Sequence, residues 1–190
     1  MAGFSPPPTK WLLIAGPTGA GKTTIARQTA SRRRVIFSID EWMSNLYWMD
    51  CPEKNDYPWA IERVRRCEQQ IEAMATQLRE RAVDVVLDLG FTTKEQRAAW
   101  MERARAAYAV PELEVVNPPA DVRWERVCER NANAEGTFSF EVTREMFDAM
   151  EALWEPISAE ERAAFAECAA SVEKAWQHEM ENIRTSKVIA

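Results

Sequence analysis

Residues 16–24, GPTGAGKTT, constrain what this chain can fold into more than any other stretch. Gly16 and Gly21 stand five residues apart and are followed at once by Lys22 and Thr23. This arrangement matches the pattern G-x-x-x-x-G-K-[ST] of phosphate-binding loops. An apolar run, WLLIA, precedes the loop and an amphipathic run, IARQTA, follows it. The sequence therefore predicts a strand, a phosphate-binding loop and a helix in direct succession.

The chemistry of phosphate binding explains this spacing. Glycines allow the backbone N–H groups to point at phosphate oxygens, and the start of a helix adds its positive end. In such loops the lysine reaches the β- and γ-phosphates, and the hydroxyl of the next residue is a ligand for Mg²⁺. We expect the nucleotide to be bound by Gly16, Pro17, Thr18, Gly19, Ala20, Gly21, Lys22, Thr23 and Thr24.

Composition excludes several classes of function. The formal net charge of −6 argues against a general nucleic-acid binder, since phosphate backbones attract basic surfaces. One histidine, His178, provides neither a histidine triad nor a histidine metal cluster. The four cysteines form no CxxC pair, which indicates free thiols in a reducing compartment. No apolar run predicts a membrane span or a signal peptide, so we expect a cytoplasmic protein.

Strands and helices alternate along the chain. Periodicity predicts strands at 11–15, 35–38, 83–88 and 113–117, and helices at 22–32, 58–82, 93–108, 121–131, 143–154 and 158–184. Capping boxes are expected at Thr92 or Thr93 and at Ser158 with Glu161. We predict an α/β fold with a mainly parallel sheet and helices on both faces. A flexible leader at 1–10 precedes a single domain at 11–190.

Two carboxylates follow predicted strands at the edge where such sheets bind ligands. Asp88 ends VVLD and is a candidate ligand for Mg²⁺, with a turn or cap residue as the alternative. Asp40 ends the second strand and is a candidate general base for transfer of phosphate to a hydroxyl. Glu41 is the second choice, and an N-cap role for Asp40 is the structural alternative.

Two further groups of side chains have alternative interpretations. Arg123, Arg126 and Arg130 share one face of a predicted helix before the loop 131–140. Arg126 and Arg130 are candidate phosphate ligands, whereas Glu125 and Glu129 favour a salt-bridged surface. The segment 41–60 is expected to be irregular, and its aromatic residues either line an acceptor pocket or pack in the core. These aromatics are Trp42, Tyr47, Trp48, Tyr57 and Trp59.

Several motifs together resemble the small P-loop kinases that include chloramphenicol phosphotransferase, zeta toxin and the kinase domain of polynucleotide kinase. The matching stretches are GPTGAGKTT at 16–24, SID at 38–40, VVLDLGFTTKEQR at 85–97, RWERVCERN at 123–131 and WEP at 154–156. They cover about residues 11–157. The chain departs from many relatives at Asp88-Leu89-Gly90-Phe91, where those carry a D-x-T-N-like run, so the acceptor cannot be carried over.

The resemblance implies a P-loop three-layer α/β/α sandwich with strand order 2-3-1-4. A fifth strand could come only from the C-terminal RTSKVIA. The resemblance also implies ATP and Mg²⁺, with Asp40 as the general base. Together with the motifs above, we expect Asp40, Lys22, Arg126 and Arg130 to be catalytic and Thr23 with Asp88 to hold the metal. A helical lid at 123–142 would carry Arg126 and Arg130, and helices at 41–82 would bind the acceptor.

Three functions follow from these features. The first is an ATP-dependent phosphotransferase acting on a hydroxyl of a small molecule. The second is a kinase for the 5′-hydroxyl of a nucleic acid, against which the net acidity weighs. The third is a regulatory module that binds and slowly hydrolyses ATP. The sequence leaves the oligomeric state open.

Overall fold

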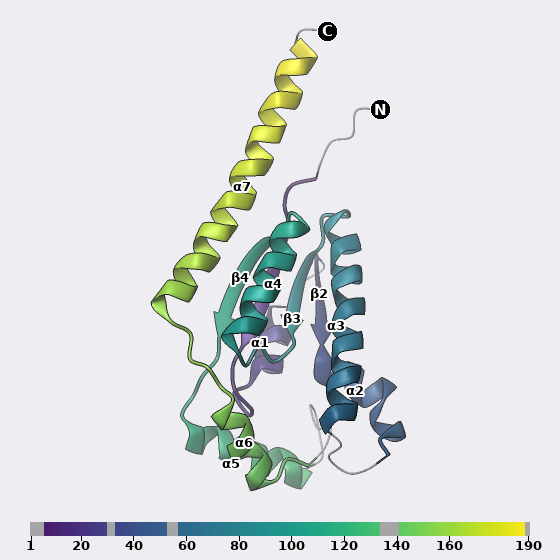
Figure 1. The fold of residues 1–190 in the computed structure, drawn as a ribbon, viewed down its shortest axis with the longest axis vertical. Coiled ribbons are helices and arrows are strands. Elements are labelled where there is room, and N and C mark those ends of the chain that lie inside the picture. The colour runs from purple at the N-terminus through teal and green to yellow at the C-terminus, as the bar shows by residue number, and fades with distance from the viewer. Residues whose placement is uncertain (1–5, 30–32, 53–56, 134–140, 189–190) are drawn as a thin grey trace.

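The computed structural model of the protein describes residues 6–29, 33–52, 57–133 and 141–188. Four parallel strands form one sheet in the order β2-β3-β1-β4, as expected for the P-loop sandwich (Figure 1). The strands are β1 Lys10–Ala15, β2 Arg34–Ser38, β3 Asp84–Asp88 and β4 Val110–Val115. Within the described stretches, no helix is long and apolar enough to cross a lipid bilayer.

Alternate residues of the strands point to opposite faces, and each face has its own core. Ile14 and Val86 pack with Ala26 of helix α1, Lys22–Gln28. The other face holds the larger core, in which Trp11 and Leu87 pack with three long helices. These helices are α3 Tyr57–Arg79, α4 Lys94–Ala106 and α7 Ala159–Val188. The result is the predicted arrangement of a sheet between helical layers.

The register of β2 and β3 determines where the strand-end carboxylates lie. Ser38 pairs with Asp88 as the last residues of their strands. Helix α2, Ile39–Leu46, follows β2 without a gap, so Asp40 stands on its first turn. Both carboxylates therefore emerge at the same edge of the sheet as the phosphate loop, which is the expectation for ligand sites in parallel sheets.

A small separate core stands at this same end of the sheet. Val127 of helix α5, Ala120–Asn133, packs with Val142 and with Phe147 of helix α6, Arg144–Ala152. Figure 1 shows α5 and α6 beyond the strand ends, while α7 runs back along the sheet and extends past its opposite end. The predicted lid region thus has its own packing; its residues 134–140 lie outside the described residues.

Two expectations about secondary structure were wrong, and the possible fifth strand is absent from the described residues. Residues 41–60 are largely helical, because α2 and a short 3-10 helix, η1 Trp48–Asp50, precede α3. The fourth strand begins at Val110, three residues before the predicted start, since an edge strand tolerates Pro111. Residues 184–188 continue α7, so the described sheet has no fifth strand.

Smaller differences concern the ends of the elements. Helix α1 ends at Gln28 with Thr29 as its C-cap, and residues 30–32 of the predicted helix lie outside the described residues. The capping box of α4 is confirmed, with Thr93 as the N-cap and Gln96 as its partner. Lys10 already belongs to β1 and Thr9 is buried, whereas residues 1–5 of the expected leader lie outside the described residues.

Candidate functional site

The phosphate loop leaves the start of α1 open to a ligand. Gly21 is the N-cap at φ 95°, a left-handed conformation that favours glycine, and no side chain caps the helix. Gly19 also has a positive φ, and a Cβ there would lie 2.5 Å from the Arg123 carbonyl oxygen. The uncapped N–H groups at this end are free to bind an anion.

Lys22 is folded back onto the loop that carries it. Its Nζ donates to the carbonyl oxygens of Gly16 at 2.8 Å and Pro17 at 3.1 Å. Burial lowers the pKa of the Lys22 ammonium below its usual value, and the nearby carboxylates of Asp88 and Asp40 oppose this change. The lysine is therefore a partly desolvated cation between two acids, suited to hold phosphate oxygens.

Thr23 and Asp88 meet directly beneath the loop. The Thr23 hydroxyl donates to Asp88 Oδ2 at 2.6 Å. Asp88 is only 4% exposed, and this burial raises the pKa of its carboxyl, while Thr23 and Lys22 act in the opposite direction. A hydroxyl and a carboxylate oxygen side by side fit Mg²⁺, which prefers oxygen ligands and takes others from substrate phosphates.

Asp40 is not a helix cap. Helix α2 begins at Ile39, and its N-cap is Ser38, whose hydroxyl accepts from the Glu41 N–H at 3.4 Å. The Asp40 carboxylate is left exposed at the cavity, whereas Glu41 forms an ion pair with Arg27 at 3.1 Å. Of the two acids, only Asp40 has no ion pair among the described residues.

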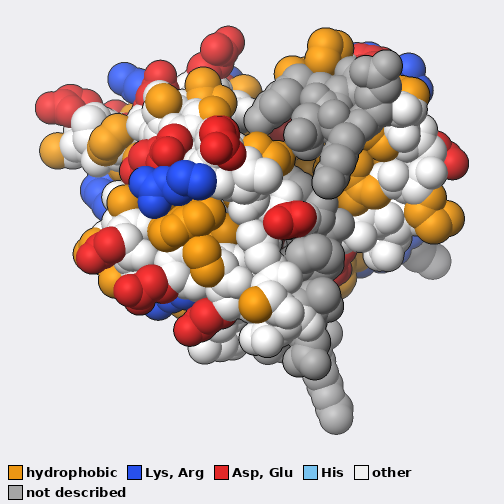
Figure 2. Space-filling model, turned by 90° about the horizontal axis from the view of Figure 1, so that it is seen from below, with side chains coloured by type: hydrophobic (Ala, Val, Ile, Leu, Met, Phe, Trp, Pro, Cys, Tyr) orange, Lys and Arg blue, Asp and Glu red, His pale blue; other side chains and the backbone are white. Residues whose placement is uncertain are grey.

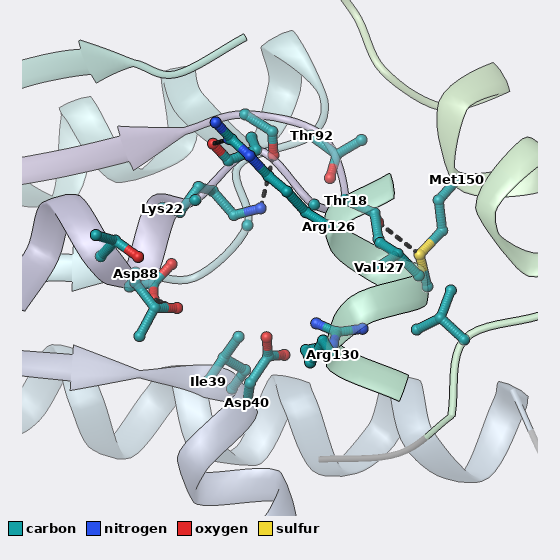
Figure 3. A pocket seen from close by; sticks show the side chains of 18 of the residues that line it. Thr18, Lys22, Ile39, Asp40, Asp88, Thr92, Arg126, Val127, Arg130 and Met150 are labelled. Atoms are coloured by element: carbon teal, nitrogen blue, oxygen red, sulfur yellow. Dashed lines mark hydrogen bonds between the residues drawn. The ribbon is translucent and has the colours of Figure 1, made fainter. Parts of the chain in front are cut away.

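The three arginines of α5 have different surroundings. Arg126 donates from Nη1 to the Ala20 carbonyl of the phosphate loop at 3.2 Å. Arg130 is half-buried and faces Asp40 across the cavity, as Figure 3 shows. Burial lowers the pKa of the Arg130 guanidinium, and Asp40 opposes this. Its Nε is buried and has no hydrogen-bond partner in the part of the chain that the structure describes.

Arg123 supports the site but is not among the residues that line the cavity. Its side chain is 2% exposed and donates to the carbonyls of Pro118 and Thr18 at 2.9 and 3.2 Å. Its Nη2 forms an ion pair with Glu151 of α6 at 2.7 Å. Arg123 therefore connects the phosphate loop to α5 and α6.

One cavity of about 840 Å³ brings these residues together. We call the part that is lined by the loop, Arg126 and Arg130 the phosphate half, and Asp88 also lines the cavity. Asp40 lines it too, together with a group of apolar side chains from other elements. Figure 2 views the same end of the molecule, where hydrophobic and charged side chains alternate on the surface around the segments drawn in grey.

Four of the five aromatic residues of 42–59 pack against the large core: Trp42, Tyr47, Trp48 and Trp59. Trp48 also lines the cavity and stacks on Trp59, with ring centroids 6.0 Å apart and an interplanar angle of 28°. The core interpretation therefore holds for these four, and an acceptor-binding role of Trp48 stays a prediction. The side chain of Tyr57 lies outside the described residues.

Sequence reasoning missed the support under the Leu89–Thr92 segment. Arg97 is fully buried, and its Nη1 donates to the carbonyls of Phe91 and Thr92 at 3.0 and 3.1 Å. Its Nη2 donates to Glu161 of α7 at 3.0 Å. The Glu161 carboxylate thereby serves Arg97, while Ser158 still accepts the Glu161 N–H of the expected capping box at 3.2 Å. A lone arginine in an exposed-looking helical pattern gave no signal of this role.

Sequence reasoning also missed the wall beside the phosphate loop contributed by α6. Met146 and Met150 line the cavity together with Val127 and Val142. The Thr18 hydroxyl lies 2.9 Å from the Met150 sulfur and donates to it. A methionine pair at i and i+4 is typical of any helix that packs on a core. The pair therefore gave no indication that these side chains line a cavity.

Comparisons with known proteins agree with this geometry. A family model described as an AAA domain matches residues 12–157. A chain of the Pnkp1/Rnl/Hen1 RNA repair complex is 18% identical with a TM-score of 0.55, over 79% of this chain and 47% of that one. An unliganded sugar kinase from Janibacter sp. HTCC2649 is 19% identical with a TM-score of 0.52, over 80% and 82%.

The family model covers most of the chain, and the two solved structures, both below 20% identity, show the fold alone. The chain spans about half the length of the RNA repair protein that it matches. A search of the curated proteins finds no match.

Proposed function

Since the chain belongs to this family of AAA domains with a P-loop kinase-like fold, we propose that it transfers the γ-phosphate of ATP to a hydroxyl of a small molecule. The observation that carries the proposal is the exposed Asp40 carboxylate in the same cavity as Lys22 and the phosphate loop. A carboxylate there also suits hydrolysis, in which a residue orients the attacking water, so label in an acceptor is the result that separates transfer from hydrolysis.

The residues have distinct roles in the proposed reaction. The loop N–H groups and Lys22 hold the phosphates, and Arg126 and Arg130 neutralise charge on them during transfer. Asp40 accepts the proton of the acceptor hydroxyl as its oxygen forms a bond to the γ-phosphorus. The bond between that phosphorus and the bridging β–γ oxygen breaks, and ADP leaves with the electron pair. The products are a phosphate monoester, ADP and a proton.

Mg²⁺ would be held by Thr23 and Asp88, whose adjacent oxygens fit it. When bound, the ion supplies positive charge that neutralises the phosphate oxygens. Because Asp88 is buried beneath the loop, rotation of its side chain is restricted. The protein's own contribution is to keep both oxygens close to the start of α1.

A panel of acceptors tests the proposal. Purified protein is incubated with γ-labelled Mg·ATP and with sugars, nucleosides, hydroxylated aromatic compounds or 5′-hydroxyl oligonucleotides. We expect label in a low-molecular-weight monoester and its absence without the acceptor. Release of free phosphate alone, at a rate that no acceptor changes, would contradict the proposal.

A nucleic-acid acceptor is the second candidate. One structural neighbour belongs to an RNA repair complex, and that likeness favours it. The net charge of −6 opposes it, because oligonucleotide binding usually needs a basic surface. Label in the oligonucleotide of the panel, lost at high salt, would favour this second candidate over the first.

A further inference from the structure

Beyond the phosphate half, the cavity is lined mainly by apolar side chains, and the segment after β3 adds Gly90 and Thr92. Six side chains form what we call the apolar wall: Ile39, Met43, Trp48, Ala60, Val64 and Leu89. They come from α2, η1, α3 and the segment after β3, and all are carbon-rich. Of the described residues that line the cavity from α2, η1 and α3, only Asp40 is charged.

The apolar wall is held in place from behind. Ile39, Met43 and Leu89 belong to the large core and are 8%, 3% and 7% exposed. Trp48 stacks on Trp59, and the Arg63 guanidinium lies 4.3 Å from the centre of the Trp59 ring. The Trp48 indole is therefore supported by packing, so the shape of this half is formed before any ligand binds.

The cations of the cavity all lie elsewhere. Among the described lining residues, Lys22 and Arg27 belong to the start of α1 and its last turn, and Arg126 and Arg130 belong to α5. Arg27 is already paired with Glu41. A phosphate or carboxylate on the acceptor would have to lie against carbon atoms, which costs free energy when no partner replaces water.

From this distribution we propose that the acceptor is an uncharged alcohol with an apolar, planar body, whose hydroxyl reaches Asp40 while its body lies on Trp48 and Val64. The inference rests on the proposed phosphotransferase function and adds the class of acceptor. Burial of an apolar body against this wall provides the binding free energy, and the single carboxylate orients the hydroxyl. A sugar would leave several hydroxyls facing carbon, and a nucleotide acceptor would also bury a phosphate there.

Three acceptors of different chemistry test this assignment. The probes are 2-(2-naphthyl)ethanol, ribose and uridine 3′-monophosphate, each incubated with γ-labelled Mg·ATP. We expect kcat/KM for the naphthyl alcohol to exceed that of the other two by about tenfold or more, as burial of an aromatic body predicts. A higher kcat/KM for ribose or for the uridine nucleotide would overturn the inference and leave the phosphotransferase function standing.

Substitutions in the apolar wall test whether this wall binds the acceptor. Trp48→Ala is expected to raise KM for the naphthyl alcohol about tenfold and to leave KM for ATP unchanged. Met49→Ala is the matched control, because Met49 is the next residue and is 92% exposed. Ala60→Leu fills the same wall without removing an aromatic ring, so it is the second test should Trp48→Ala fail to fold. Equal KM values in wild type and both wall variants would contradict the proposal.

A protein without phosphotransferase activity would give a different set of results. If the wild-type protein binds ATP but labels none of the three probes, the phosphotransferase assignment falls and the acceptor class falls with it. If it labels only ribose or the uridine nucleotide, the assignment of an apolar acceptor alone is wrong. Nucleotide binding measured calorimetrically in the same samples separates these results from loss of the folded protein.

Discussion

The two halves of the cavity are built in contrasting ways. The phosphate half comes largely from one continuous stretch, whose lysine folds back on its own carbonyls at 2.8 and 3.1 Å. Five residues of the apolar wall come from α2, η1 and α3 between positions 39 and 64, and Leu89 comes from the segment after β3. A short motif is sufficient to specify the first half, whereas the second half depends on the packing of the whole larger core.

This contrast also separates what each half determines. The phosphate half presents backbone N–H groups and cations, which suit the part of the reaction common to nucleotide-dependent transfer. The wall presents carbon atoms and one carboxylate, which distinguish one acceptor from another. Substitutions in the two halves should therefore change different kinetic constants, and substitutions outside both should change stability alone.

Removal of the support shared by both halves should have the largest effect. Arg97→Met leaves the Glu161 carboxylate buried without its partner and frees the Phe91 and Thr92 carbonyls. We expect the free energy of unfolding to fall by about 3–5 kcal/mol, or Tm by roughly 6–20 °C, in thermal unfolding followed by circular dichroism. The double variant Arg97→Met with Glu161→Leu should be less destabilised. A single variant as stable as wild type would contradict this role.

A change confined to the phosphate half should remove transfer without unfolding the protein. Lys22→Ala deletes the cation that holds the phosphates in the proposed reaction. We expect kcat to fall by about 10²–10³-fold for every acceptor, as for loss of one preorganised charge at a developing anion. Lys174→Ala, on an exposed part of α7, is the control. Acceptor-dependent losses in Lys22→Ala would mean that the two halves are not independent.

Arg130 lies where the two halves of the cavity meet, so its substitution tests to which half it belongs. Its guanidinium faces Asp40 and its Nε has no partner among the described residues. We expect Arg130→Ala to reduce kcat about tenfold or more, the worth of one hydrogen bond to a charged group. KM for the acceptor should not change. If only the acceptor KM rises, Arg130 belongs to the acceptor site and not to the phosphate half.

The smallest effect is expected from Glu68, which lies away from the cavity on the helix that carries Ala60 and Val64. The quantity affected is the pH dependence of stability. Burial raises the pKa of the Glu68 carboxyl above its ordinary 4.5, while Arg103 and a hydrogen bond from Trp100 oppose this. The folded protein then binds this proton more tightly than the unfolded chain does. Stability is therefore lost as pH rises from about 4.5 through the raised pKa.

Glu68→Gln removes that loss. We expect the variant to have the higher Tm at pH 7 and the same Tm as wild type below pH 4, with unchanged kinetic constants. Glu80→Gln, an exposed residue beyond the end of α3, should match wild type at both pH values. A difference between Glu68→Gln and wild type that persists unchanged at low pH would rule out titration as its cause.

Much of the phosphate half could be predicted from the sequence, because chemistry and spacing within one segment determine it. The strand order agrees with expectation, and the loop and Asp88 lie at the predicted edge of the sheet, while their roles in binding stay predictions. Asp40 lines the cavity, although its role stays a prediction. Helix α2 was missed, since its start depends on the Ser38 cap inside a segment crowded with aromatic residues.

The supporting contacts could not be predicted for a different reason. Arg97 and Glu161 are 64 residues apart, and each fits an ordinary solvated helix in its own segment. Only the packing of α4 against α7 brings them together and removes them from water. The methionines of α6 and the partners of Trp48 are similar: their residue types fit a core as well as a pocket until the fold is known.

The role of Asp40 is the central claim, and one comparison tests it most directly. Transfer of labelled γ-phosphate and binding of ATP are measured in the same preparations of wild type, Asp40→Asn and Glu41→Gln. We predict that Asp40→Asn binds ATP normally and transfers about 10²–10⁴-fold more slowly, as loss of a general base requires. Glu41→Gln should transfer at nearly the wild-type rate. Full transfer activity in Asp40→Asn would contradict the account.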